Sequence, residues 1–399
     1  MKKSKLKIEI IDDGVNMKLL YKLRGKDSNI INHYTGIKQY IDPLQKINHG
    51  TICTSILLEM LENNGCIDKT EIISFSVLDK DKKYNIQKLY EAIQWGIDHE
   101  VNLISLSIGS KEFITSEKII EVSKRAQSKN IIIVAAGAND GIITYPACLS
   151  SVIGVKTTDL KTESIHKNPI DGIDINANVP NLNLLKILRQ DLDYFLHATN
   201  SLIAPIITAQ IADVFLQEEK IFSILKTKEL LAKKKSIKLI SDSYDYPPLK
   251  AIGKTKEIED RQIPIIAIEY HHSNKSNIIN LAKALQQEFV LNEYNCACIS
   301  DIIQLNCFEK NRYKLPVKNV KDWMRFYLHF LTSNIIIIII EEKHISSIIS
   351  SDSVDAIISE REIFWNYPSY HLKLLDTSLA SHNIFKWVIN LFNAQGNGF

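Results

Sequence analysis

The sequence predicts an α/β protein whose larger part is a doubly wound parallel sheet with helices on both faces. Between about residues 6 and 218, short apolar runs alternate with amphipathic segments of helical period, which is the pattern of repeated strand and helix units. A second alternating series begins near residue 263 and includes six consecutive isoleucines at 335–340. Such a run is typical of a central parallel strand that is buried on both faces. We therefore expect a second, smaller α/β unit.

The expected elements follow from apolar period and turn residues. In the helix expected at 85–100, for example, Leu89, Ala92, Ile93 and Ile97 lie on one face. The expected strands are 6–11, 71–78, 101–108, 131–136, 151–156, 263–268, 295–300, 334–340 and 354–358; the expected helices include 50–62, 85–100, 117–129, 277–289 and 320–331. We predict a domain over 1–218, a charged linker over 219–254 that contains Tyr246-Pro247-Pro248, and an accessory domain over 255–399.

Composition excludes several classes of function. The 48 Lys and Arg residues nearly balance 46 Asp and Glu residues, giving a net charge of +2, so we expect neither nucleic acid nor a membrane surface as a partner. The isoleucine run is far shorter than the roughly 20 apolar residues that a spanning helix needs. The six cysteines are scattered and are expected to be free thiols in a reducing compartment. We predict a soluble, cytoplasmic protein; a homo-oligomer stays open.

Four polar residues come at strand ends or helix starts of the first unit. Asp12 ends the first strand, His49 begins a helix, Asn139 follows a buried strand, and Ser201 precedes a long apolar helix. Each has an ordinary structural explanation: a turn carboxylate, an exposed histidine, a turn asparagine and a helix N-cap. In an open α/β sheet, however, such positions meet at the edge where catalytic groups collect. The four together predict an active site.

The surrounding motifs resemble those of the subtilisin-like serine peptidases. The chain order Asp, His, Ser is the subtilisin order and differs from that of other Ser-His-Asp hydrolases. The resemblance covers about residues 6 to 218. It is carried by Asp12-Asp13-Gly14, His49-Gly50-Thr51, the stretch from Ala135 to Gly141, Tyr145-Pro146-Ala147, and Ser201 with Pro205 at the start of a helix.

The resemblance implies a serine endopeptidase. Ser201 would be the nucleophile, His49 the general base and Asp12 its orienting carboxylate, and Asn139 would help to form the oxyanion hole. An extended peptide would pair with a substrate-binding edge made of Ser105, Ser107, Ile108 and Gly109. For Ser107 and Gly109, a plain junction between strand and loop is the alternative.

Two departures from the family pattern give rise to a competing hypothesis. Thr199-Asn200 stands where the family has Gly-Thr, and Ala138 stands where it has Gly. A non-glycine residue is strained if its position needs a positive φ. The competing hypothesis is therefore a catalytically inactive pseudo-peptidase that binds an extended peptide within a peptide-maturation system.

The first strand begins within ten residues of Met1, so we expect folding without a cleaved pro-segment. This pattern is similar to that of cytoplasmic subtilisin-like peptidases that trim the leaders of ribosomally made, modified peptides. The resemblance thus implies a peptide precursor as substrate.

The accessory domain resembles a P-loop fold that has lost its phosphate loop. Lys275 and Ser276 fit the frame G-x-x-x-x-G-K-[ST], but Glu269 and Asn274 replace its two glycines. A carboxylate there would repel phosphate, so we predict no nucleotide cofactor. We also predict no metal, because the adjacent histidines His271 and His272 have no third ligand nearby in the sequence. Leader recognition and subunit pairing stay open as the role of this domain.

Overall fold

The computed structural model describes residues 5–24, 30–33, 47–78, 84–158, 162–191, 194–241, 263–302, 307–349, 354–359, 370–373 and 381–394. The chain forms two compact units that divide near residue 242. The rest of the expected linker, residues 243–254, lies outside the described residues. The two units are considered one at a time below.

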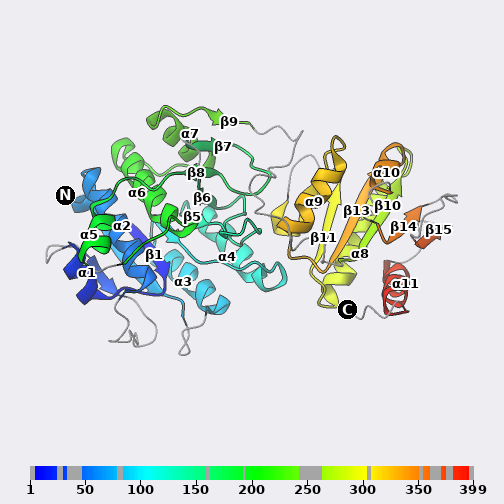
Figure 1. Cartoon of the computed structure of the whole chain (residues 1–399), viewed down its shortest axis with the longest axis horizontal. Helices are drawn as coiled ribbons and strands as arrows, with labels where there is room; N and C mark the ends of the chain where they lie inside the picture. The colour runs from blue at the N-terminus through cyan, green and yellow to red at the C-terminus, as the bar shows by residue number, and fades with distance from the viewer. Residues whose placement is uncertain are drawn as a thin grey trace. The chain divides into compact units, whose positions relative to one another are not determined.

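The first unit is built on a nine-stranded sheet with the order β2-β3-β1-β4-β5-β6-β8-β7-β9 (Figure 1). β7 and β8 pair antiparallel, and the other described strand pairs of this sheet are parallel. The strands are β1 (Leu6–Asp12), β2 (Ile30–His33), β3 (Thr70–Ser76), β4 (Leu103–Leu106), β5 (Ile132–Ala136), β6 (Ile153–Thr157), β7 (Ser164–His166), β8 (Ile175–Ala177) and β9 (Leu239–Ile240).

Helices cover both faces of this sheet, which confirms the doubly wound fold. The helices α2 and α6 pack against each other and against β1, whereas α3 packs against α4 and the opposite face. Successive side chains of β1 point to opposite faces of the sheet. Ile8 and Ile10 join the core under α2 and α6, while Glu9 faces α3. The helices are α1 (Met17–Arg24), α2 (His49–Asn63), α3 (Ile86–Asp98), α4 (Glu117–Ser128), α5 (Asn183–Asp191), α6 (Asn200–Glu218) and α7 (Ile224–Lys234), with short 3₁₀ turns at Ile67–Lys69 and Ile114–Ser116.

Part of the expected linker is folded into the first unit. The helix α7 packs against α6, and β9 pairs with β7 at the edge of the sheet. A buried ion pair anchors α7, since Lys228 Nζ lies 2.6 Å from Asp174 Oδ1 with both side chains under 10% exposed. The charge of this segment is thus partly structural and does not mark a linker throughout.

The side chain of Glu9 is buried in the middle of β1. Neither carboxyl oxygen has a hydrogen-bond partner, and burial raises the pKa of Glu9 well above its usual value. Burial therefore favours the neutral, protonated form of this carboxyl group. Gly96 of α3 makes room for it: a Cβ at this glycine would lie 2.1 Å from Glu9 Oε2.

We expect the Gly96→Ala change to depend on Glu9. In the native chain it should destabilise the first unit by about 1–3 kcal/mol, because a buried carboxyl group cannot swing away. In a Glu9→Ala background the closest contact is gone, and only Val101 Cγ2 at 3.1 Å and Ile104 Cδ1 at 3.2 Å stay near the added Cβ, so the same change should cost at least about 1 kcal/mol less. Denaturant unfolding of the four proteins measures this coupling. A coupling energy near zero would contradict the assigned contact.

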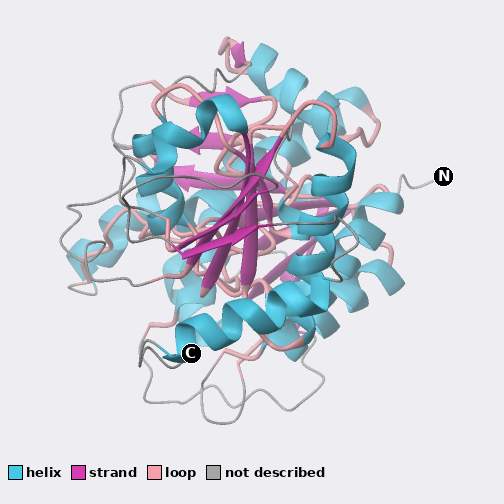
Figure 2. Cartoon of the chain, turned by 90° about the vertical axis from the view of Figure 1, so that its right-hand side faces the viewer, coloured by secondary structure: helices cyan, strands magenta, loops and turns pink. Residues whose placement is uncertain are grey.

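The second unit contains a six-stranded parallel sheet with the order β12-β11-β13-β10-β14-β15. Figure 2 shows strands fanned into a twisted sheet with helices on both sides. The elements are β10 (Ile265–Tyr270), α8 (Lys275–Leu291), β11 (Cys296–Ser300), β12 (Arg312–Lys314), α9 (Val320–Phe330), β13 (Ile335–Glu341), α10 (Glu342–Ile349), β14 (Ala356–Ser359), β15 (Tyr370–Lys373) and α11 (Ser381–Ala394), with a 3₁₀ turn at Phe308–Lys310. The isoleucine run is confirmed as a central strand, since residues 335–340 of β13 are at most 3% exposed.

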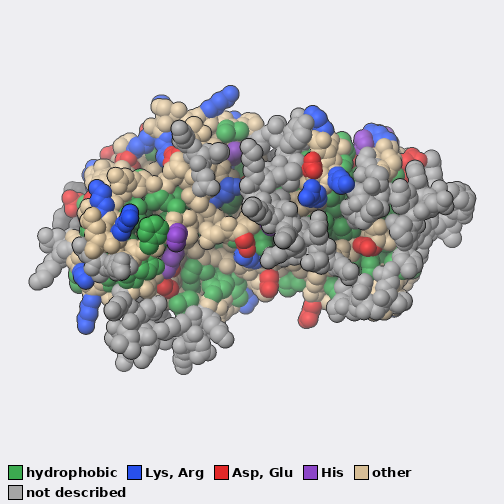
Figure 3. Space-filling model, viewed as in Figure 1, with side chains coloured by type: hydrophobic (Ala, Val, Ile, Leu, Met, Phe, Trp, Pro, Cys, Tyr) green, Lys and Arg blue, Asp and Glu red, His purple; other side chains and the backbone are tan. Residues whose placement is uncertain are grey.

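On the face drawn in Figure 3, basic and acidic side chains of the described residues are scattered among polar and apolar ones. Among the same residues, no helix is both long enough and apolar enough to cross a bilayer.

Candidate active site

The first strand and the second helix bring Asp12 and His49 together. Asp12 ends β1, and Gly14 turns the chain with φ of 93°. A Cβ on Gly50 would lie 2.3 Å from the carbonyl oxygen of Gly14, so glycine lets α2 start directly against this turn, as the sequence predicts. His49 Nδ1 lies 2.9 Å from both carboxylate oxygens of Asp12.

Ser201 lies on the other side of the imidazole. It is the second residue of α6, and its Oγ lies 2.9 Å from His49 Nε2. The structure thus places Asp12, His49 and Ser201 in one hydrogen-bonded row, although 152 residues separate the histidine from the serine. This is the geometry that a serine nucleophile, a general base and an orienting carboxylate need.

The surroundings of His49 change its proton affinity. Burial lowers the pKa of the imidazole, whereas Cys53 and the Asp12 carboxylate beside the ring raise it, and the net shift is upward. His49 must be neutral to accept a proton. A base at this position would therefore need a higher pH than an ordinary histidine to be neutral.

Asn139 follows β5 and is exposed at the site. Its Oδ1 accepts a hydrogen bond of 2.9 Å from the backbone N–H of Asn200. This contact orients the side-chain amide so that its NH₂ group is turned to the other side. The backbone N–H of Ser201 belongs to the first turn of α6, where N–H groups have no acceptor within the helix. The Asn139 amide and this N–H are the two donors that the sequence predicts for an oxyanion hole.

The two departures from the family pattern do not produce the strain that the sequence suggested. Thr199 has an extended backbone with φ of −124°, and neither Ala138 nor Asn200 is among the described residues with positive φ. Both residues before the serine make contacts instead. Thr199 Oγ1 lies 2.9 Å from Ser201 Oγ.

Asn200 is buried and ties three segments together. Its Oδ1 accepts from the N–H of Thr157 at 2.9 Å, and its Nδ2 donates to the carbonyl oxygens of Gly137 and Ala138 at 3.1 and 2.9 Å. The side chain thus holds the ends of β5 and β6 against the start of α6. Sequence reasoning noted Asn200 only as a missing threonine.

We expect Asn200→Ala to loosen this arrangement. The loss of three buried hydrogen bonds should lower the free energy of unfolding by about 1–3 kcal/mol. Because Ser201 and Asn139 lose their common support, kcat should fall roughly 10- to 100-fold, with a smaller change in KM. Steady-state kinetics measure the split. The control is Asn176→Ala, which removes a hydrogen bond to Ser164 in β7; equal losses of kcat in both variants would contradict the positioning role of Asn200.

The expected substrate-binding residues differ in exposure. Ser105 lies within β4 and is 0% exposed, whereas Ser107, Ile108 and Gly109 are half-buried. Ser107 Oγ donates to the carbonyl oxygen of Ser201 at 3.0 Å. A Cβ on Gly109 would lie 2.6 Å from the carbonyl oxygen of Tyr145, so this glycine permits the approach of the chain's own backbone. For a peptide-binding edge, Ser107, Ile108 and Gly109 stay candidates, and the side chain of Ser105 is out of reach.

Two residues of the site escaped the sequence analysis. Asp13, which the sequence offers only as part of the motif around Asp12, caps α2: its carboxylate accepts from the N–H of His49 at 3.1 Å and from that of Gly50 at 2.6 Å. Asn48 Nδ2 supports it from 2.9 Å. The cap fixes the start of the helix that carries His49.

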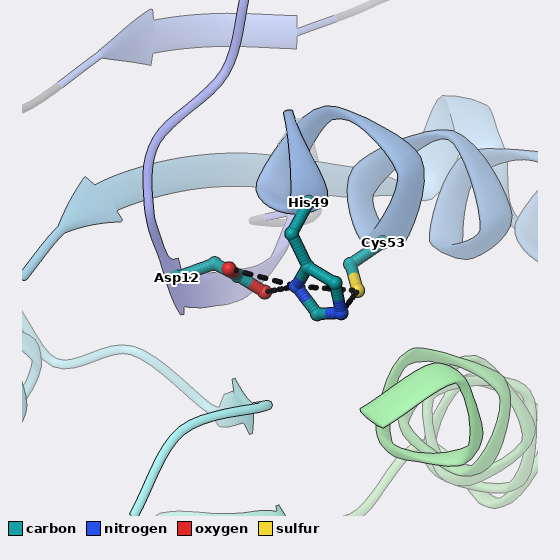
Figure 4. A group of neighbouring side chains, drawn as sticks. All are labelled: Asp12, His49 and Cys53. Atoms are coloured by element: carbon teal, nitrogen blue, oxygen red, sulfur yellow. Dashed lines mark hydrogen bonds and ion pairs between the residues drawn. The ribbon is translucent and has the colours of Figure 1, made fainter. Parts of the chain in front are cut away.

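Cys53 is the second such residue. It lies one turn after His49 on α2, and Figure 4 shows the imidazole between the Asp12 carboxylate and the Cys53 thiol. Its Sγ is 3.6 Å from Nδ1 and 3.8 Å from Nε2. Burial raises the pKa of the thiol, and a thiol is a poor nucleophile unless it is deprotonated. Ser201, whose Oγ is hydrogen-bonded to His49 Nε2 at 2.9 Å, is therefore a better candidate for the nucleophile than Cys53. The ligand atoms of Asp12, His49 and Cys53 lie within 4.8 Å of one another and form a group that could hold a soft metal ion.

The chain belongs to the subtilase family, whose profile matches residues 3–239. It is similar to the minor extracellular protease Epr of Bacillus subtilis (strain 168), with 23% identity over 45% of this chain and 27% of that protein. It is also similar to the thermophilic serine proteinase of Bacillus sp. (strain AK1), with 28% identity over 38% of each chain, and to the intracellular serine protease of Paenibacillus polymyxa, with 25% identity over 33% of this chain and 45% of that one. The matches span less than half the length of these relatives.

Among solved structures, the chain matches the crystal structure of a lanthipeptide protease. It has a TM-score of 0.42 and 14% identity, over 61% of this chain and 81% of that one. The structure of the prenylagaramide maturation protease PagA has a TM-score of 0.36 and 17% identity, over 59% of this chain and 79% of that one.

Proposed function

We propose that this protein is a serine endopeptidase that cleaves a peptide bond through Asp12, His49 and Ser201. The observation that carries the proposal is the position of the imidazole, with Ser201 Oγ at 2.9 Å from one ring nitrogen and Asp12 at 2.9 Å from the other. The match to the subtilase family over residues 3–239 supports it.

The first half of the reaction forms an acyl-enzyme. Ser201 Oγ attacks the carbonyl carbon of the scissile bond, and His49 Nε2 takes the hydroxyl proton. Asp12 holds the proton on Nδ1 and stabilises the imidazolium. The negative charge on the substrate oxygen is met by the Asn139 amide and the Ser201 N–H. His49 then gives its proton to the leaving amine as the C–N bond breaks, which leaves an ester on Ser201.

The second half restores the enzyme. Water attacks the ester carbonyl, and His49 takes a proton from the water and returns it to Ser201 Oγ as the C–O bond breaks. The products are one free carboxylate and one free amine. No cofactor takes part in this scheme.

The substrate that we propose is an extended peptide segment, and the narrower hypothesis is the leader of a ribosomally made precursor. A segment in extended form could add its backbone alongside residues 107–109, which end β4 at the site. The alternative of an inactive pseudo-peptidase depends on backbone strain in the residues just before Ser201. Since Thr199 and Asn200 have unstrained backbones and the hydrogen bond from Ser201 to His49 is present, nothing in the described site favours that alternative.

A peptide library tests the activity and its selectivity together. The full chain and its Ser201→Ala variant are incubated with a mixture of folded proteins and precursor peptides that carry a leader and a core, and new N-termini are read by mass spectrometry. We expect cleavage by the native chain alone, at one junction of a precursor. Cleavage at many sites in unrelated proteins would retain the peptidase and reject the leader hypothesis. If the folded native chain binds a precursor but does not cleave it, both the peptidase activity and the leader hypothesis are rejected.

A further inference from the structure

A group of polar side chains lies at the centre of the second sheet, outside the site described above. The strands β10 and β13 are adjacent and parallel, with Glu269 opposite Ile340 and Tyr270 opposite Glu341. The residues that follow the two strands, His271 after β10 and Glu342 after β13, therefore lie side by side at the carboxyl edge of the sheet. Glu269 and His271 are two positions apart, so a strand directs both to the same face.

This place in the sheet is a topological switch point. From β10 the chain passes through α8 to β11 on one side, and from β13 it passes through α10 to β14 on the other side. Both crossover connections are expected to be right-handed, and they run in opposite directions along the sheet. The helices α8 and α10 should therefore lie on opposite faces of it. In agreement, α8 and α11 belong to one core layer, which does not include the buried residues Ile345 and Ile348 of α10. In open α/β sheets, ligands bind in the crevice that opens between two such strands.

The three side chains converge at this crevice. One ligand atom from each of Glu269, His271 and Glu342 lies within 4.8 Å of the others. His271 Nδ1 and Glu342 Oε2 are 2.7 Å apart, within ion-pair distance, so these two atoms need to separate by only about 0.7 Å to reach the roughly 3.4 Å between ligands placed tetrahedrally around an ion with bonds of about 2.1 Å. The group combines a 95% buried carboxylate with two ligands that solvent can reach, since Glu269 is 5% exposed and the side chains of His271 and Glu342 are 17% and 42% exposed.

Further hydrogen bonds hold the ligand-bearing segments in place. The N–H of His271 donates to Asn274 Oδ1 at 2.7 Å, which fixes the loop before α8. The N–H of Glu341 donates to Asp301 Oδ2 at 3.0 Å, which ties the end of β11 to the end of β13. Preorganised segments of this kind are the support that metal ligands require.

We propose that Glu269, His271 and Glu342 form a binding site for a divalent transition-metal ion. One imidazole with two carboxylates suits Zn²⁺ or Mn²⁺ better than Ca²⁺ or Mg²⁺, which prefer oxygen ligands throughout. Three protein ligands leave at least one coordination position open for water or a bound molecule. Glu269 stands at the first position of the degenerate phosphate loop, so the carboxylate that repels phosphate becomes a ligand for a cation. No third ligand lies near His271 in the sequence; the fold supplies Glu342, the first residue of α10, from 71 residues further along the chain.

Metal titration of the full chain tests the site. Because Asp12, His49 and Cys53 could also take a metal, the chain carries His49→Ala throughout. After treatment with a chelator, Mn²⁺ binding is followed by electron paramagnetic resonance and Zn²⁺ binding by calorimetry. We expect one equivalent of either ion to bind saturably and to raise the melting temperature of the second unit.

Three variants and one control assign the ligands. His271→Ala and Glu342→Gln should each weaken binding at least 10-fold and abolish the metal-dependent rise in melting temperature. Glu269→Gln should do the same. The control is His382→Ala, which removes another histidine of this unit that faces a glutamate, with Nδ1 at 3.5 Å from Glu288 Oε2; its metal binding should equal that of the parent. If Glu269→Gln fails to fold, the two more exposed ligands decide. Absence of one-to-one binding, or binding unchanged in His271→Ala and Glu342→Gln, would overturn the proposal.

Discussion

Replacement of Ser201 by alanine is expected to lower kcat by about 10⁶, a magnitude taken over from the triad of subtilisin. Without Oγ no acyl-enzyme forms, and only the oxyanion donors and substrate binding still act on the peptide bond. KM should change little, because Oγ contributes mainly after the substrate is bound. Hydrolysis of a fluorogenic peptide by native and variant proteins gives both constants.

The same experiment reveals whether Ser201 and His49 act as one unit. His49→Ala should lower kcat about as much as Ser201→Ala, and the double variant should be no worse than either, because the histidine has no role once its partner is absent. Ser128→Ala, a change at an exposed serine at the end of α4, is the control and should leave kcat unchanged. Losses that multiply in the double variant would show that the two residues act independently.

Asp12→Asn is the second change with a large expected effect. An asparagine cannot keep the proton on His49 Nδ1 or stabilise the imidazolium, so kcat should fall by about 10⁴, again a magnitude from a serine peptidase triad. Asp12 is nearly buried and both oxygens lie 2.9 Å from Nδ1, so the geometry should survive the substitution. A crystal structure or thermal unfolding of the variant separates this loss from misfolding.

The pH profile adds a readout that loss of structure alone would not give. Activity requires neutral His49, so kcat/KM rises as pH rises through the pKa of His49 in the free enzyme. That pKa is raised, so the rise should occur above the value near 6.5 of an ordinary histidine. Asp12→Asn removes one of the groups that favour the imidazolium, and the rise should move to lower pH. An unchanged profile in the variant would contradict the assigned pairing.

The fold was predictable because its signals are local. Alternating apolar runs located β1, β3, β5, β6 and most helices, and the isoleucine run marked the centre of the second sheet. The end of the first domain was harder to place, because Lys228 and its neighbours on α7 look like a solvated charged segment. Only the structure pairs Lys228 with the buried Asp174, since a partner 54 residues away leaves no mark on local composition.

The same distinction between local signals and long-range contacts applies to the site. Asp12, His49, Asn139 and Ser201 could be proposed from motifs, and the structure brings these four together. The contacts of Asp13, Cys53 and Asn200 could not be foreseen, because each depends on how one element meets another. Asn200 is the clearest case: the sequence presents it as a departure from a family pattern, whereas its side chain bonds to three backbone groups from two strand ends.

Labelling with a fluorophosphonate, followed by peptide mapping, decides whether Ser201 is an activated nucleophile. We expect one covalent phosphonyl group per chain on Ser201, formed more slowly in Asp12→Asn and absent in Ser201→Ala. A folded native chain that takes up no label, or a label on another residue that persists in Ser201→Ala, would show that Ser201 is not the nucleophile.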